Sequence, residues 1–97
     1  MSGTFTINQD RRRFELETDG HIAFIDYRLS DDNVMSLTHT EVPAALGGKG
    51  LGSRIVEHAL QYIKDNQYKL VPLCPFVAKF VRTHREWQSL LADDFKV

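Results

Sequence analysis

One stretch of this sequence, Glu41–Gln61, constrains the possible folds more strongly than any other. An extended apolar segment runs into Pro43, a glycine-rich loop follows, and a long amphipathic helix begins after the loop. Glycine lets backbone N–H groups approach a ligand closely, and the first N–H groups of a helix lack internal partners. Because the helix dipole is positive at that end, this order of elements predicts a site for an anion such as phosphate or pyrophosphate.

Two common phosphate-binding patterns do not match the glycine loop. The Walker A pattern fails because its first glycine would fall on Pro43, and because Gly50 follows Lys49 where Ser or Thr is needed. The dinucleotide pattern G-x-G-x-x-G starts at Gly48 but ends on Ser53. A doubly wound dinucleotide domain would also need several βαβ units, and this chain has room for about one.

A third pattern, Gln/Arg-x-x-Gly-x-Gly/Ala, spans residues 47–52, with Gly47 in the position of Gln or Arg. This loop resembles motif A of the GCN5-related N-acetyltransferases (GNATs), which holds the pyrophosphate of coenzyme A. The pattern alone leaves open a turn between strand and helix that binds no ligand.

Charge and composition exclude several classes of protein. The 97 residues are enough for one domain, 1–97, with a buried core. Basic and acidic residues number 12 and 13, so the overall charge favours neither nucleic acid nor a membrane as partner. We interpret the run Arg11–Arg13 as a solvated turn, because acidic residues flank it.

The single cysteine, Cys74, excludes an internal disulfide and a metal site made of several thiolates, and no metal is expected. It fits a reducing compartment. The N-terminus has no apolar signal region, and no apolar run approaches the length of a membrane span. We therefore expect a soluble, cytoplasmic protein.

Alternation of apolar and polar residues predicts an antiparallel meander in the first half of the chain. The Asp19-Gly20 pair predicts a hairpin turn. The third strand carries apolar residues on both faces, so we expect it to be covered on both sides. The expected strands are Phe5–Asn8, Arg13–Glu17, His21–Leu29 and Val34–Val42.

Simple alternation along Val34–Val42 gives one face to Met35, Leu37, His39 and Glu41. Two titratable side chains, His39 and Glu41, would then stand together beside the glycine loop. They are candidates for the general base of a reaction. The alternative is that they interact only with each other or with solvent.

The helix after the loop should bury one apolar stripe and end near Asp65, after which Lys69–Cys74 forms a strand. A crossover through one helix makes this strand parallel to the strand before the helix. Pro72 has no N–H, so pairing should fail there and open a gap beside the end of Val34–Val42.

Cys74 precedes Pro75, which suits the first position of a second helix, so Cys74 is expected at or near the N-cap. The helix N-terminus favours a thiolate there. Cys74 is therefore a candidate acid, base or transient acyl acceptor, and the alternative is a small buried apolar residue. Lys79, on the same helix, is a cation that either reaches a phosphate or is solvated.

The wider pattern is similar to a group of very small, stand-alone GNAT-like proteins. The resemblance rests on three segments in this order, and it covers nearly the whole chain: Thr38–Pro43, Gly48–Ser53 and Val71–Val77. It implies one minimal acetyltransferase domain with an α+β, GNAT-like three-layer fold. In that fold a mixed, mostly antiparallel sheet of about five strands is combined with the helix after the loop and one or two C-terminal helices.

The resemblance also implies a site for acetyl-CoA in the strand gap, with pyrophosphate on the N–H groups of Gly48–Ser53 and pantetheine bonded to the backbone of Val42. Three features depart from the family pattern. Gly47 replaces Arg or Gln, Val81 stands where many relatives carry a Tyr acid, and the N-terminal helices that wall the acceptor site are absent. The residues implied in binding acetyl-CoA are Val42, Gly47, Gly48, Lys49, Gly50, Leu51, Gly52, Ser53, Cys74, Phe76 and Lys79.

The function expected from these features is N-acetylation of an unidentified amine on a protein, peptide or small molecule, by a monomer or homodimer. Glu41 or His39 would act as base, and Cys74 would protonate the leaving thiolate or accept the acetyl group. Two alternatives remain open: a module that binds coenzyme A without catalysis, and an interaction protein whose glycine loop is structural.

Overall fold

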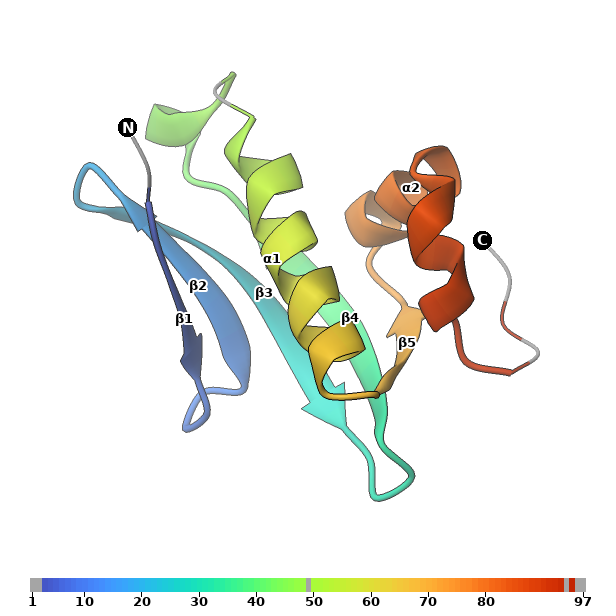
Figure 1. The fold of residues 1–97 in the computed structure, drawn as a ribbon. Coiled ribbons are helices and arrows are strands. Elements are labelled where there is room, and N and C mark those ends of the chain that lie inside the picture. The colour runs from blue at the N-terminus through green and yellow to red at the C-terminus, as the bar shows by residue number, and fades with distance from the viewer. Residues whose placement is uncertain (1–2, 49, 94, 96–97) are drawn as a thin grey trace.

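The computed structural model describes residues 3–48, 50–93 and 95. The elements lie close to the ranges expected from the sequence (Figure 1). In chain order they are β1 (Thr4–Asn8), β2 (Arg13–Thr18), β3 (His21–Leu29), β4 (Val34–Glu41), the 3-10 turn η1 (Ala44–Leu46), α1 (Leu51–Asp65), β5 (Lys69–Pro72), α2 (Pro75–Thr83) and the 3-10 helix η2 (Arg85–Leu90).

The five strands form one sheet in the order β1-β2-β3-β4-β5. The first four pair antiparallel as a meander, and β5 pairs parallel with β4 after the chain has crossed over through α1. The expected meander, crossover and mixed sheet are therefore confirmed. Within the described residues, no helix has both the length and the apolar character needed to cross a membrane.

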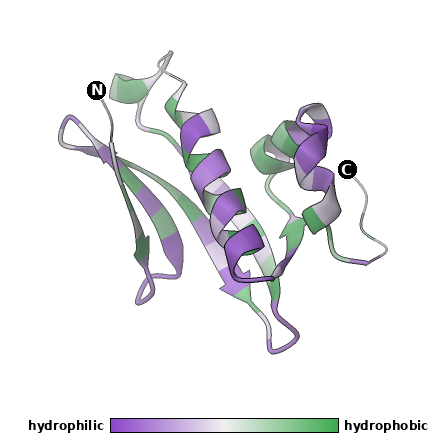
Figure 2. Ribbon diagram, in the orientation of Figure 1, coloured by the Kyte–Doolittle hydropathy of each residue, from purple (hydrophilic) through white to green (hydrophobic). Residues whose placement is uncertain are grey.

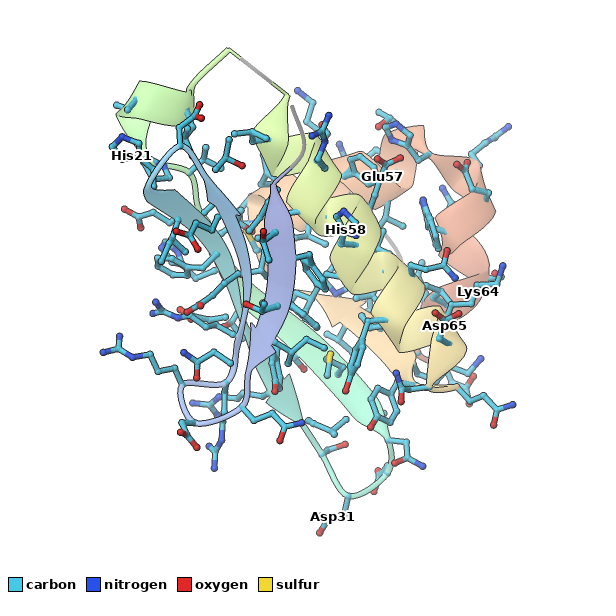
Figure 3. The ribbon with its side chains drawn as sticks, turned by 60° about the vertical axis from the view of Figure 1, so that its left-hand side comes forward. His21, Asp31, Glu57, His58, Lys64 and Asp65 are labelled. Carbon is cyan, nitrogen blue, oxygen red and sulfur yellow. The ribbon has the colours of Figure 1, made fainter. Side chains whose placement is uncertain are left out.

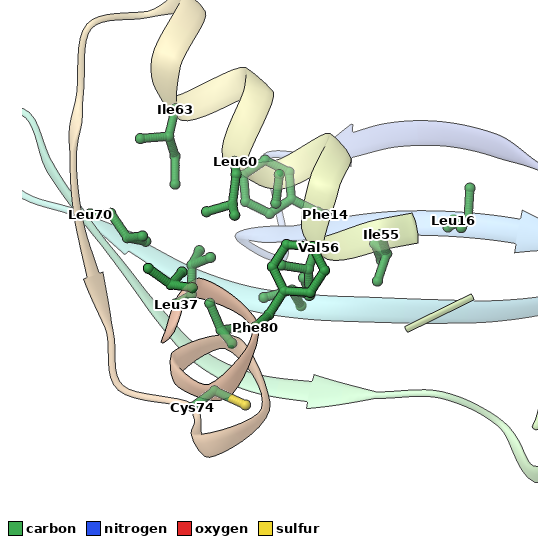
Figure 4. Close-up of a cluster of buried hydrophobic side chains, with 14 of the residues drawn as sticks. Phe14, Leu16, Leu37, Ile55, Val56, Leu60, Ile63, Leu70, Cys74 and Phe80 are labelled. Atoms are coloured by element: carbon green, nitrogen blue, oxygen red, sulfur yellow. The ribbon is translucent and has the colours of Figure 1, made fainter. Parts of the chain in front are cut away.

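Helices α1 and α2 pack on the same face of the sheet (Figure 1) and share one core with it. Apolar and polar residues alternate along β2 (Figure 2), and its apolar residues Phe14 and Leu16 are buried in this core. Figure 4 shows the core cluster that results. Its fully buried members include Phe14, Leu16, Ile25, Leu37, Ile55, Val56, Leu60, Ile63, Leu70 and Val77.

The opposite face of the sheet is open, so the expectation that His21–Leu29 is covered on both sides is wrong. Ile22, on that face, is 44% exposed, and Phe24 is only half-buried. The Arg13 guanidinium lies 3.8 Å from the centre of the Phe24 ring and pairs with Asp26 at 3.4 Å. An arginine stem and an aromatic ring can shield apolar surface from water without a helix above them.

A β-bulge interrupts the pairing of β3 with β4. Tyr27 lies opposite Leu37, and the preceding residue of β3, Asp26, lies opposite His39. Thr38 is therefore an extra residue in β4. The Thr38 hydroxyl donates a hydrogen bond to the Asp26 carbonyl at 3.4 Å. A bulge of this kind breaks the simple alternation of side chains along a strand.

The bulge reverses the expected faces of the end of β4. Thr40 lies opposite the buried Ile25 and therefore shares the helix-covered face. Glu41 lies opposite Phe24, and the His39 ring is 6.1 Å from the Phe24 ring, so both titratable residues belong to the open face. The expectation that His39 and Glu41 share a face with the buried residues of β4 is thus wrong.

Candidate functional site

The glycine loop adopts backbone angles that explain two of its glycines. Gly48 has φ 77° and Gly50 has φ 71°, in the left-handed region that L-residues with side chains rarely adopt. Gly47 is extended, with φ −63° and ψ 149°, and any residue can take that conformation. Lys49, which the sequence placed among the coenzyme-binding residues, lies outside the described residues.

No side chain of the described residues caps the N-terminus of α1. The N-cap, Gly50, offers no side-chain cap, and the first turn contains no acidic residue. Arg54 N is the first backbone donor into the helix, bonding to Gly50 O at 3.1 Å. Within the described residues, the N–H groups of Leu51, Gly52 and Ser53 have no acceptor inside the helix, and no acidic side chain of the first turn neutralises the positive end of the helix dipole.

These residues line a groove, here called the glycine groove, with a volume of about 330 Å³. A neighbouring depression of about 240 Å³ shares Ser53 and Phe76 with it and extends the surface to Lys79. Phe76 packs so closely on Gly52 that a Cβ at residue 52 would lie 2.8 Å from the ring. The glycine groove is lined by Val42, Leu46, Gly47, Gly48, Gly50, Leu51, Gly52, Ser53 and Phe76.

The gap expected at Pro72 is confirmed. Pairing of β4 with β5 ends at Leu37 and Pro72. Leu73 N and Cys74 N then both donate to Leu37 O, at 3.0 and 2.9 Å, and the chain turns into α2. Beyond Leu37, the remainder of β4 has no strand partner on the β5 side among the described residues. That unpaired edge leads directly to the glycine groove.

Cys74 is the N-cap of α2, as expected, and lies at the margin of the core (Figure 4). It is 6% exposed, and its Sγ lies 3.3 Å from the Thr40 hydroxyl oxygen. Burial alone would raise the pKa of the Cys74 thiol. Hydrogen bonds from the Thr40 side chain and from the backbone N–H groups of Val77, Phe76 and Thr40 outweigh burial and lower this pKa below its ordinary value.

We expect the rate of alkylation of Cys74 by iodoacetamide to rise with pH around a midpoint below that of a free cysteine. The Thr40→Val variant should move this midpoint upward, because it removes the hydroxyl that stabilises the thiolate. Because the pKa of the Cys74 thiol is lower in the folded protein than in the unfolded chain, the thiolate stabilises the fold at any pH above the pKa of the unfolded chain. This stabilisation is lost as the pH falls through the pKa of Cys74 in the folded protein. An unchanged midpoint in Thr40→Val would contradict this description of the thiol.

The structure brings together most of the residues expected at the site, but it separates them into two sets. Cys74, Phe76 and the glycine loop lie on the helix-covered side of β4. On the open side, His39 Nε2 and Glu41 Oε1 are 2.9 Å apart, and both side chains are more than half exposed. The end of β4 therefore lies between a buried thiol and an exposed histidine–carboxylate pair.

Two residues of this region were not identified from the sequence. Thr40 contacts Cys74 only because the bulge turns it toward the helices. Leu46, 1% exposed, lines the glycine groove from η1. An apolar residue before a glycine loop is a weak signal for Leu46, and the sequence holds no comparable signal for the bulge.

Comparisons with known proteins agree with this geometry. A family model described as GCN5-related N-acetyl-transferase matches residues 13–90. Protein NATD1 of Homo sapiens is 29% identical over 80 residues, which cover 78% of this chain and 71% of that protein. Protein NATD1 of Mus musculus is 27% identical over 77 residues, covering 77% and 70%.

A solved structure has the same fold. The NMR solution structure of a GCN5-like protein from Staphylococcus aureus superposes with a TM-score of 0.72 and 23% identity. The match covers 92% of this chain and 87% of that one. At this identity, the likeness concerns the arrangement of the strands and helices.

Proposed function

The chain belongs to the GCN5-related N-acetyltransferase family, and on that basis we propose that it transfers the acetyl group of acetyl-CoA to an amine. One observation carries the proposal. The uncapped N-terminus of α1 and the unpaired edge of β4 meet at one groove, beside a thiol whose pKa is lowered. A pyrophosphate and an extended pantetheine arm need such an anion site and such a strand edge.

The residues of the glycine groove have the chemistry to hold coenzyme A. The N–H groups of Leu51, Gly52 and Ser53 would bind pyrophosphate, and Lys79, in the neighbouring depression, would neutralise a further phosphate. Val42 would offer backbone hydrogen bonds to the pantetheine, and exposed Phe76 an apolar surface. Acetyl-CoA supplies an activated thioester, and the protein must bind it, orient it and move protons.

The two sides of β4 would divide the proton transfers. Glu41 or His39, on the open side, takes a proton from the amine, directly or through water, as its nitrogen bonds to the acetyl carbon. The carbon–sulfur bond then breaks, and the Cys74 thiol protonates the departing thiolate from the helix side. In a two-step alternative, Cys74 accepts the acetyl group first and passes it to the amine.

Replacement of Glu41 by Gln is expected to lower kcat by about 10²–10⁴-fold, because a general base contributes roughly this factor. Affinity for acetyl-CoA should be unchanged, because Glu41 lies on the opposite side of β4 from Cys74. Glu17→Gln is the matched control, since Glu17 is an exposed carboxylate on the same sheet face. If Glu41→Gln and His39→Gln both kept full turnover, neither Glu41 nor His39 would be the general base.

The assay would mix isotope-labelled acetyl-CoA with a lysine peptide, a free amino-terminal peptide and a polyamine, and detect acetylated products by mass spectrometry. Product from at least one amine supports the proposal. Cys74→Ala then separates the routes: unchanged turnover would exclude Cys74 as acid and as acetyl carrier. Binding of acetyl-CoA with no product from a broad amine panel would contradict catalysis.

The open sheet face favours one other function, a module that binds coenzyme A without transferring its acyl group. No described helix covers the face on which an amine would approach, and Ile22 there is 44% exposed. Such a site holds a small acceptor less firmly than a closed one. Tight binding of coenzyme A and acetyl-CoA with equal affinity and no turnover would favour the module.

A further inference from the structure

A second concave site lies at the end of the molecule opposite the glycine groove. It is bounded by the β1–β2 turn, the end of β3, and the last turns of α1 with the loop after it, and has a volume of about 580 Å³. We call it the tyrosine recess. Because α1 has 15 residues and is about 22 Å long, a ligand here would not touch the glycine groove. Figure 3 marks this end with Asp31 and Asp65.

Three half-buried tyrosines, Tyr27, Tyr62 and Tyr68, converge in the recess. The rings of Tyr27 and Tyr62 are held against buried Phe14, at centroid distances of 5.0 and 5.5 Å. The Tyr62 and Tyr68 rings meet edge to face at 6.1 Å. Three phenols in fixed positions present hydroxyl donors to one space, beside the buried side chain of Met35.

The hydroxyls of Tyr27 and Tyr62 remain protonated at physiological pH, because the pKa of each is raised above its ordinary value. Burial and the proximity of Tyr62 and Tyr68 raise the pKa of Tyr27, although the Arg12 guanidinium opposes this. Burial and the hydrogen-bonded neighbour Tyr68 raise the pKa of Tyr62. Groups that stay protonated act as donors and do not repel an anion.

The charged residues lining the recess are both cations. Arg12 and Arg28 line it together with Gln9, and none of the described residues that line it is a carboxylate. In the described part of the chain, the ion pairs join Arg13 to Asp26 and His39 to Glu41, so neither Arg12 nor Arg28 is paired. Arg28 alternates with Tyr27 and Leu29 along β3, so the guanidinium that faces the phenols is that of Arg12, which interacts electrostatically with Tyr27. The recess therefore combines one unpaired guanidinium with phenol donors, and its rim contains Leu29, which is 44% exposed.

We propose that the tyrosine recess binds a small organic oxyanion, a carboxylate or phosphate monoester attached to a flat apolar body. Arg12 and the phenol hydroxyls bind the oxyanion, since a guanidinium offers paired donors in a plane. The tyrosine rings, Leu29 and Met35 contact the apolar body. The volume falls within the range of pockets that hold small ligands, roughly 300–1,000 Å³.

The test is a titration of isotope-labelled protein with phenyl phosphate, followed by amide NMR shifts. Inorganic phosphate and benzyl alcohol supply the oxyanion and the ring separately. Phenyl phosphate should shift the signals of Arg12, Tyr27, Tyr62 and Tyr68, and should bind more tightly than either fragment. Equal affinity for benzyl alcohol, or shifts spread over the whole surface, would overturn the proposal.

Matched variants test the donors themselves. Arg12→Gln and Tyr62→Phe should each weaken phenyl phosphate binding by roughly tenfold or more, the usual effect of losing one hydrogen bond to a charged group. Arg11→Gln is the control, because Arg11 is exposed in the same turn but does not line the recess. If Arg11→Gln and Arg12→Gln weakened phenyl phosphate binding equally, the effect would come from the overall positive charge of the turn, and the proposed site would be wrong. Acetyl-CoA affinity should not change in any of them.

Discussion

Replacement of Phe14 by Ala is expected to lower the free energy of unfolding by about 3–5 kcal/mol, the usual cost of removing a buried aromatic side chain. Phe14 is fully buried, and its ring packs on Phe5, Tyr27 and Tyr62. For a domain of this size the melting temperature should fall by roughly 15–30 °C. Urea unfolding followed by circular dichroism would measure the change.

Phe24→Ala is the matched control on the neighbouring strand. Phe24 is half-buried on the open face, where the Arg13 guanidinium lies over its ring and the His39 ring lies beside it. Its removal should cost about 1 kcal/mol, from the lost cation–π contact and a small buried area. Equal decreases in the free energy of unfolding of Phe14→Ala and Phe24→Ala would contradict the conclusion that the helices cover only one face of the sheet.

Replacement of Gly50 by Val should weaken the binding of acetyl-CoA at the glycine groove. Gly50 has φ 71°, and the left-handed conformation costs a side-chain-bearing residue roughly 1–2 kcal/mol, and a β-branched residue more. If the loop relaxes to avoid this strain, the N–H groups of the first turn of α1 turn away from a common point. The dissociation constant for acetyl-CoA should rise by more than about tenfold.

Gly47→Val separates backbone strain from added bulk in the same loop. Gly47 is extended, and the one described atom that a Cβ there would approach is the Ala44 carbonyl oxygen, at 3.2 Å. This variant should keep both its stability and its affinity for acetyl-CoA within about threefold of the parent protein. The interpretation of the loop would be wrong if Gly47→Val lost binding while Gly50→Val retained it. Calorimetric titration measures both affinities.

Much of the fold could be predicted because local patterns and topology agreed. Alternation fixed the four strands of the meander, and the apolar stripe of α1 fixed its buried face. Pro72 predicted the end of strand pairing because proline has no N–H to donate. The structure confirms that β5 ends at this residue.

The faces of β4 could not be predicted in the same way. Simple alternation assumes that each residue of β4 lies opposite one residue of β3. Thr38 has no such partner, because Asp26 pairs with His39 and Tyr27 pairs with Leu37. A single insertion of this kind exchanges the faces of all later residues. It moved His39 and Glu41 to the open side and brought Thr40 to Cys74, which no residue pattern indicated.

The open face of β3 was also missed, for a different reason. Ile22 and Phe24 are apolar, and apolar residues on both faces usually indicate a strand between two layers. Arg13 of β2 lies opposite Asp26 of β3, and Phe24 is two residues before Asp26. The sequence does not reveal that the Arg13 side chain lies over the Phe24 ring. Side-chain cover of this kind depends on the register of β2 with β3.

The most direct test of the central claim, that the glycine groove and the strand gap hold acetyl-CoA, is an amide NMR titration of the labelled protein. We predict saturable shifts centred on Val42, Gly48, Gly50–Ser53 and Cys74, with small changes at the tyrosine recess. The absence of shifts at millimolar acetyl-CoA would contradict the claim, and the glycine loop would then be a structural turn between β4 and α1.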